Sequence, residues 1–182
     1  MRPALLLLLL MFSQPAWSSD PVWQALQSGG VVALVRHARA PGTGDPANFQ
    51  LGDCSTQRNL SEEGQRQARE IGEQFRRRQV PIEQVLSSRW CRALDTARLA
   101  FGNLVQPEPS LDSFFSGRSQ EEVQSQAVRH LVESWRSKGV LVLVTHQVNI
   151  TALTGIFPAE GEMLVLRPRE GSGFDVIGRI GL

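Results

Sequence analysis

Two of the three histidines in this 182-residue chain follow apolar runs of the kind that form buried strands. Val31 to Val35 leads into Arg36-His37, and Val140 to Val144 leads, after one threonine, into His146. Arginine and histidine are costly to bury without partners, so their place at the ends of these runs indicates a site rather than a core.

A third polar segment, SSRWCR at residues 87–92, follows strand-like residues that end at Ser87. In an open α/β sheet, ligands bind just beyond the carboxyl ends of the strands. We therefore expect one pocket at these ends, lined by Arg36, His37, Arg92 and His146. Ser88 and Asn149 are candidates for further hydrogen bonds near that pocket.

The residue types in this pocket suit the transfer of a phosphoryl group. Arginine forks match phosphate oxygens bidentately. A neutral imidazole can attack phosphorus and form a covalent intermediate, which splits one difficult step into two easier ones. Cationic neighbours stabilise the charge that builds on the equatorial oxygens, and they also lower the pKa of the attacking histidine.

The rest of the chain predicts helices alternating with strands, and therefore an α/β fold. We expect a three-layer sandwich with a mostly parallel central sheet and helices on both faces. Residues 40–59 are rich in Gly, Pro, Asp and Asn and predict a long loop of functional importance. The expected strands are 31–35, 83–87, 140–144, 163–167 and 174–180, with an edge strand within 106–116, and the expected helices are 21–28, 62 to the arginine run at 76–78, 93–101, 120–138 and 148–154.

The bulk composition describes one globular domain, and its net charge of +1 gives no reason to expect nucleic acid as a partner. Residues 1–18 form a separate segment, with Arg2, the apolar run Leu5 to Phe12 and a small-residue cleavage pattern at Ala16-Trp17-Ser18. This pattern predicts a signal peptide, an exported mature domain over 19–182, and no stable membrane insertion after cleavage. An uncleaved N-terminal anchor is the alternative.

Export changes the interpretation of Cys54 and Cys91, the only two cysteines. In an oxidising compartment a pair of cysteines favours a disulfide, and neither has the spacing of a metal ligand. The bridge would close a loop of about 38 residues. A free buried thiol at either position is the alternative.

Four motifs in order, LVRHA, LSEEGQRQA, LSSRWCRALDTA and LVTHQ, resemble those of the histidine phosphatase superfamily, which has the phosphoglycerate-mutase-like fold. The resemblance covers nearly the whole mature chain. It implies that His37 is the phosphorylated nucleophile and that Arg36, Arg92 and His146 hold the phosphate. It also implies that a separate carboxylate protonates the leaving group, and that neither a metal nor an organic cofactor is needed.

Departures from the family pattern bear on specificity. Arg39 stands where glutamate is most common, which makes it a candidate for a rim or substrate contact, or for a solvent-facing side chain. Gln147 follows the second histidine in place of the aspartate that donates a proton in histidine acid phosphatases. Asp112 is then the first candidate for the proton donor, followed by Glu108 and Asp53.

These observations predict a periplasmic or secreted phosphomonoesterase that works as a monomer through phosphohistidine. Its small size and signal peptide resemble the exported bacterial branch that includes lipopolysaccharide core heptose phosphatases. The expected partner is a small phosphorylated substrate, with a sugar or cell-envelope phosphate among the candidates. A catalytically inactive module that binds a phosphorylated ligand is the alternative, whereas a metal or redox protein lacks the necessary ligand spacing.

Overall fold

The computed structural model describes residues 20–181, which form a six-stranded sheet with strands in the order β3-β2-β4-β1-β5-β6. Four neighbouring strands, β1 to β4, run parallel, and β5 and β6 are antiparallel to their neighbours. The mostly parallel sheet predicted from the sequence is therefore confirmed. The strands are β1 (Val32–Arg36), β2 (Ile82–Ser87), β3 (Val105–Pro107), β4 (Val140–Thr145), β5 (Met163–Pro168) and β6 (Phe174–Ile180).

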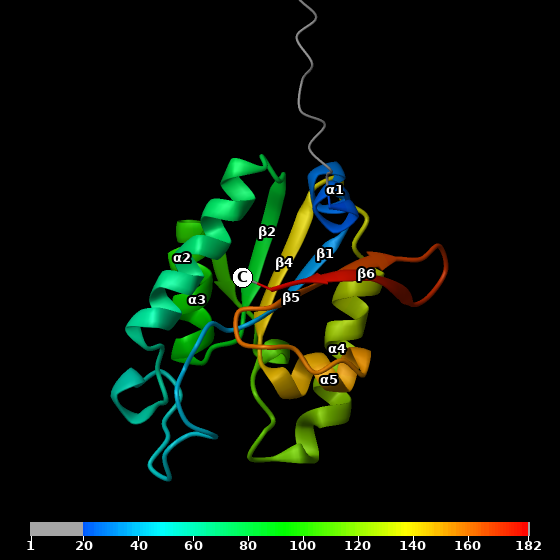
Figure 1. The fold of residues 1–182 in the computed structure, drawn as a ribbon. Helices are drawn as coiled ribbons and strands as arrows, with labels where there is room; N and C mark the ends of the chain where they lie inside the picture. The colour runs from blue at the N-terminus through cyan, green and yellow to red at the C-terminus, as the bar shows by residue number, and fades with distance from the viewer. Residues whose placement is uncertain (1–19, 182) are drawn as a thin grey trace, which may run out of the picture.

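Helices cover both faces of the sheet, as Figure 1 shows, with α2 and α3 on one side and α4 and α5 on the other. The first layer also includes α1. The helices are α1 (Pro21–Ser28), α2 (Glu62–Arg77), α3 (Cys91–Phe101), α4 (Glu121–Glu133) and α5 (Gln147–Thr154), with short 3₁₀ turns at Cys54–Thr56, Gly102–Leu104, Pro109–Leu111 and Arg118–Gln120.

The central strands are apolar on both faces because each face packs against a helical layer. Along β1, Ala33 and Val35 join the core beneath α1, α2 and α3, while Val32 and Leu34 join the core beneath α4 and α5. All four side chains are buried. This two-sided burial explains why β1 and β4 appear in the sequence as continuous apolar runs rather than as alternating ones.

Helix α4 is shorter than the sequence predicted, because it ends at Glu133 and not at Lys138. Ser134 caps it, and its hydroxyl donates to the His130 carbonyl at 2.6 Å. Trp135 then turns back, packs against the core beneath α4 and donates its indole N–H to the Gly139 carbonyl. The helical periodicity of this segment predicted a longer helix, because it does not show that Trp135 packs against the core. The chain after Glu133 therefore leaves the helix.

The sheet register brings the predicted functional segments to one edge. Arg36 of β1 pairs with Thr145 of β4, and Ser87 of β2 pairs with Val144. The backbone N–H of His37 donates to the Thr145 carbonyl at 2.9 Å, so the two segments that carry the histidines are directly linked. The polar residues that follow these three strands therefore lie at the same end of the sheet, the lower edge in Figure 1.

The predicted disulfide between Cys54 and Cys91 is present, with a Cα–Cα distance of 5.7 Å. It joins the end of the long loop after β1 to the first residue of α3. The Gln57 side chain adds a second link, because its carbonyl oxygen accepts from the Cys91 backbone N–H at 2.9 Å. The loop is therefore held against the start of α3.

Replacing both Cys54 and Cys91 with serine is expected to lower the free energy of unfolding by about 2–4 kcal/mol, because the unfolded chain regains the freedom of the long loop that the bridge closes. Urea unfolding of the double variant measures the loss. The wild-type protein treated with a reductant serves as a control and should show a similar loss. An unchanged unfolding midpoint in both samples would contradict this account of the bridge.

The predicted signal segment, residues 1–18, lies outside the described residues. None of the helices formed by residues 20–181 combines the length and the hydropathy that crossing a bilayer requires.

Candidate active site

His37 lies directly after β1 and is 2% exposed. Its Nδ1 is 2.8 Å from the Ala38 carbonyl oxygen. A carbonyl oxygen only accepts hydrogen bonds, so Nδ1 must carry the proton in this contact. The lone pair of the neutral ring is then on Nε2, so this tautomer allows a nucleophilic attack through Nε2.

The surroundings of His37 keep the ring unprotonated. Burial lowers its pKa to about 3, and the positive charges of Arg92, Arg36 and Arg58 act in the same direction. The hydrogen bond to Ala38 opposes this shift. His37 is therefore neutral at any physiological pH.

Three arginines line the pocket into which His37 opens, a cavity of about 200 Å³. Among residues 20–181, none of the side chains that line this cavity is a carboxylate, so its wall is strongly cationic. The lining consists of Arg36, His37, Gly42, Thr43, Gly44, Arg58, Arg92, Ser113, Phe115, His146, Gln147, Val148 and Phe157. This charge and size suit a phosphoryl group, which carries negative charge on all of its free oxygens.

Three buried nitrogen atoms of this lining make no hydrogen bond to any described residue. They are Nε of Arg36, Nε of Arg92 and Nδ1 of His146. Buried polar groups are otherwise nearly always paired, and an exception calls for an explanation such as a ligand. All three residues line the cavity next to His37, where an oxyanion could act as an acceptor for them.

His146 begins α5 as its N-cap and is 3% exposed. Its ring is 5.3 Å from that of His37, measured between centroids. Its Nε2 is 2.8 Å from the Ser88 hydroxyl, which is in turn 3.3 Å from Oδ1 of Asp112. Burial holds the pKa of His146 well below its usual value, and the positive neighbours lower it further.

Asp112, the first candidate for the proton donor, is buried but does not line the cavity around His37. Its Oδ2 pairs with the Arg89 guanidinium at 2.5 Å, and its Oδ1 accepts from the Arg89 backbone N–H at 2.8 Å. The structure thus places Asp112 behind His146, in contact with it through Ser88. Its role as a proton donor remains a prediction.

The two other acids considered for this role also lie away from the cavity. Glu108 accepts from the Ser110 backbone N–H, and Asp53 accepts from the Ser55 backbone N–H. Each carboxylate therefore caps a short 3₁₀ turn.

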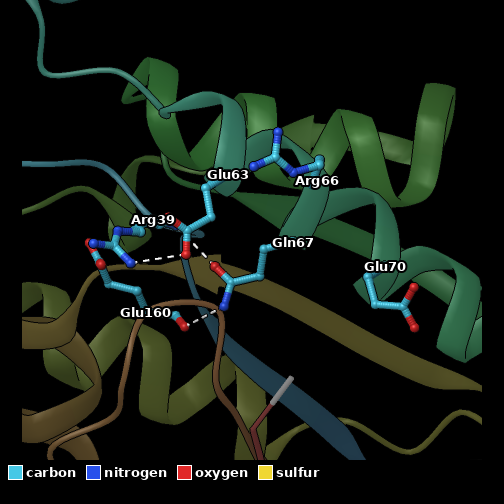
Figure 2. A pocket seen from close by; sticks show the side chains of 6 residues that line it. All are labelled: Arg39, Glu63, Arg66, Gln67, Glu70 and Glu160. Atoms are coloured by element: carbon cyan, nitrogen blue, oxygen red, sulfur yellow. Dashed lines mark hydrogen bonds and ion pairs between the residues drawn. The ribbon is translucent and has the colours of Figure 1, made fainter.

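Asn149 is close to this group, because its side-chain N–H donates to the Asp112 backbone carbonyl at 2.9 Å. Arg39, by contrast, faces a separate groove of about 560 Å³ between α2 and the loop before β5. Figure 2 shows its guanidinium directed at Glu63, with Gln67 and Glu160 beside it. Arg39 is therefore adjacent to the site but does not line the cavity of His37.

Two residues of the site, Arg58 and Asp45, were not predicted from the sequence. Arg58 lines the cavity, and its Nε donates to the Gly44 carbonyl at 2.8 Å. Asp45 accepts hydrogen bonds from Arg92 and from the Trp90 indole. Both belong to the loop after β1, and a sequence signal for Arg58 did exist, since it is the only arginine within residues 40–59.

The two buried histidines make the fold sensitive to acid. The pKa of His37 is about 3 in the folded chain and about 6.5 when unfolded, so at intermediate pH only the unfolded chain binds this proton. The free energy of unfolding should therefore fall as pH drops from about 6.5, by up to about 1.4 kcal/mol per pH unit for this histidine. Urea unfolding between about pH 7 and pH 5 measures the slope. His37→Gln should reduce the dependence of the free energy of unfolding on pH. An identical slope in the variant would show that His37 is not its source.

Among residues 20–181, no group of three His, Cys, Asp or Glu side chains is placed to hold a metal ion.

The arrangement of fold and site matches a known family. Residues 32–124 match the model of the histidine phosphatase superfamily (branch 1), and the chain belongs to this superfamily. This match spans β1 with His37, α3 with Arg92, and Asp112. No curated protein matches the chain.

Solved structures support the fold assignment. The chain is similar to the protein histidine phosphatase SixA complexed with tungstate, at 17% identity over 82% of this chain and 96% of that one, with a TM-score of 0.60. It is similar to phosphoserine phosphatase from Entamoeba histolytica with 3-phosphoglyceric acid, at 16% identity over 84% and 97%, with a TM-score of 0.61. A mycobacterial glucosyl-3-phosphoglycerate phosphatase matches at 19% identity over 81% and 98%, with a TM-score of 0.57. At these identities the likeness establishes a common fold.

Proposed function

We propose that this protein is an exported phosphomonoesterase that acts through a covalent phosphohistidine on His37. The observation that carries the proposal is that Arg36, Arg92 and His146, each with an unpartnered buried nitrogen atom, line the cavity next to the neutral His37 ring. Membership of the histidine phosphatase superfamily supports it. So do the structural neighbours, several of which are named as phosphatases.

In the first step of the proposed reaction, the Nε2 lone pair of His37 attacks phosphorus, and the bond from phosphorus to the ester oxygen breaks. The alcohol leaves with a proton. Arg36, Arg58 and Arg92 hold the phosphoryl oxygens and stabilise the charge that develops on them. In the second step a water molecule attacks phosphorus, the N–P bond breaks, and inorganic phosphate leaves with His37 restored.

The leaving-group alcohol needs a proton as the bond from phosphorus to oxygen breaks. Asp112 is the proposed donor, and its link to His146 through Ser88 gives the proton a hydrogen-bonded route towards the cavity. If solvent supplies the proton instead, esters with good leaving groups will react faster than alkyl esters. Hydrolysis of Asp112→Asn with both ester types distinguishes the two sources, since loss of a proton donor slows the alkyl ester more.

The mouth of the cavity suits an organic leaving group. Phe115 and Phe157 line it and are 51% and 65% exposed, which is unusual for large apolar side chains. Apolar surface next to a cationic phosphate site fits a ligand with a charged head and an organic body. The sequence resemblance to lipopolysaccharide core heptose phosphatases predicts a sugar or cell-envelope phosphate as the substrate, and this stays a prediction.

Export to the periplasm or the exterior is proposed on two observations. One is the signal pattern in residues 1–18, and the other is the Cys54–Cys91 disulfide, a bond that persists in oxidising compartments. N-terminal sequencing of the protein recovered from outside the cytoplasm tests this, and cleavage after Ser18 is the expected result. Recovery of the uncleaved chain at the membrane would favour the anchor.

The catalytic proposal is tested by hydrolysis of p-nitrophenyl phosphate by the mature protein in the presence of a chelator. Turnover that requires His37 is the expected result. A folded protein that binds inorganic phosphate but hydrolyses no ester would instead be a binding module for phosphorylated ligands.

A further inference from the structure

Besides the disulfide and Gln57, the carboxylate of Asp45 also attaches the loop between β1 and α2 to the start of α3. Its Oδ1 lies 2.5 Å from Nη1 of Arg92, and its Oδ2 lies 3.2 Å from Nη2 of the same guanidinium. The Arg92 side chain is 3% exposed and that of Asp45 is 17% exposed, so water screens the pair poorly. This is a bidentate pair, the strongest and most directional form of an arginine contact.

The pairing fixes the direction of the donors that Arg92 has left. A guanidinium is planar and holds its five N–H groups in a rigid fork. With Nη1 and Nη2 bound to Asp45, the Nε–H direction is set, and this Nε is a buried nitrogen without a hydrogen-bond partner among the described residues. Asp45 thereby determines how Arg92 meets a phosphoryl oxygen.

Asp45 also holds two other parts of the site. Its Oδ2 accepts from the Trp90 indole N–H at 2.9 Å, and the Trp90 ring packs edge-on against His146. Its Oδ1 accepts from the Arg58 backbone N–H at 3.4 Å. Phe49, from the same loop, stacks on Trp90 with ring centroids 4.9 Å apart. The carboxylate therefore contacts Arg92 and Arg58, which line the cavity, and Trp90, which packs against His146.

Asp45 is not placed to react with a substrate itself. It does not line the cavity, although its neighbour Gly44 does. Burial alone would raise the pKa of its carboxyl, but hydrogen bonds from Arg92 and Trp90 and the Arg92 charge hold the pKa below its usual value. Its two oxygens accept from Arg92, from the Trp90 indole and from the Arg58 backbone, and the Arg92 guanidinium is therefore its main partner.

We propose that Asp45 is a positioning residue for phosphoryl transfer, which aims the Arg92 guanidinium at the transition-state oxygens. The inference rests on the proposed function and names a residue that the motifs of the chain do not include. Catalysis depends on hydrogen-bond donors that are oriented before the reaction begins. A wrongly oriented Arg92 should therefore destabilise the transition state more than the bound ground state.

The test compares Asp45→Asn with wild type in two measurements, kcat for p-nitrophenyl phosphate and the Kd for inorganic phosphate by calorimetry. We expect kcat to fall by about 10–100-fold, since one guanidinium is no longer correctly aimed. The Kd should change by less than about threefold, because removing a negative charge near the anion offsets the looser fit. An unchanged kcat would overturn the proposal. An increase in Kd as large as the decrease in kcat would also overturn it, because a disordered site would give that result.

Three controls make the result specific. Asp175→Asn breaks another Asp–Arg pair, an exposed one with Arg169 in the β5–β6 hairpin, and should leave both values unchanged. Asp45→Glu retains a carboxylate for Arg92 and should lose less activity than Asp45→Asn, which also covers the case in which Asp45→Asn does not fold. In an Arg92→Gln background, Asp45→Asn should cause little further loss of kcat, because Asp45 acts through Arg92.

The leaving group separates positioning from proton donation. The factor lost in Asp45→Asn should be the same for p-nitrophenyl phosphate and for an alkyl phosphate. A much larger loss for the alkyl ester would overturn the proposal and make Asp45 the proton donor. Wild type without turnover would overturn the proposed function and this inference together, whereas an active wild type with an equally active Asp45→Asn would overturn this inference alone.

Discussion

His37→Ala is expected to lower kcat for phosphate ester hydrolysis by about 10⁴-fold or more, since removal of a covalent nucleophile typically has an effect of that order. The physical reason is that the variant lacks the Nε2 lone pair that forms the N–P bond. None of the neighbouring arginines can replace it, because arginine stays protonated in proteins. The measurement is steady-state hydrolysis of p-nitrophenyl phosphate, with calorimetric binding of inorganic phosphate on the same sample.

The matched control is His130→Ala, a histidine in the last turn of α4 that is exposed to solvent. It should retain wild-type kcat. The His37→Ala protein should still bind inorganic phosphate, because Arg36, Arg58, Arg92 and His146 remain in the cavity. Hydrolysis that survives in His37→Ala at near the wild-type rate would exclude His37 as the nucleophile.

Arg92→Lys is expected to lower kcat/KM by about 10²–10³-fold, the loss typical when a preorganised donor to the transition state is removed. Lysine retains the positive charge that Asp45 needs, so the fold should persist. It cannot bind Asp45 with two nitrogens and direct a third at the phosphoryl group, because its ammonium is a point charge and not a fork.

Arg98→Lys, on the same helix but exposed, is the matched control and should leave kcat/KM unchanged. If Arg92→Lys loses less than about threefold, the fork geometry of Arg92 is unimportant, and only the positive charge of the cavity contributes.

Much of the architecture was predictable from the sequence because it follows local patterns. The apolar runs that become β1 and β4 end at His37 and His146, and parallel pairing brings these ends together at one edge of the sheet. The disulfide was predictable because the chain has only two cysteines. These features depend on strand patterns and composition rather than on the path of any loop.

The features that the sequence did not reveal depend on tertiary contacts. Asp45 reaches Arg92 across 47 positions of the chain, through a loop whose course no periodicity describes. Asp112 was predicted as the proton donor, but the ion pair of its carboxylate with Arg89 was not predictable from the sequence. A tertiary contact also explains why α4 is shorter than predicted, because Trp135 packs against the core and does not continue the helix.

The central claim is that the reaction passes through a phosphoryl group on His37, and the most direct measurement is to trap it. The mature protein is mixed with a ³²P-labelled phosphate ester, quenched in denaturant within the first turnover, and digested for mass spectrometry. The account predicts phosphate on the peptide that contains His37, stable in alkali and released by acid, as a nitrogen–phosphorus bond is. Turnover without any such phosphopeptide, or with an acid-stable phosphate on Ser88 or another hydroxyl, would contradict it.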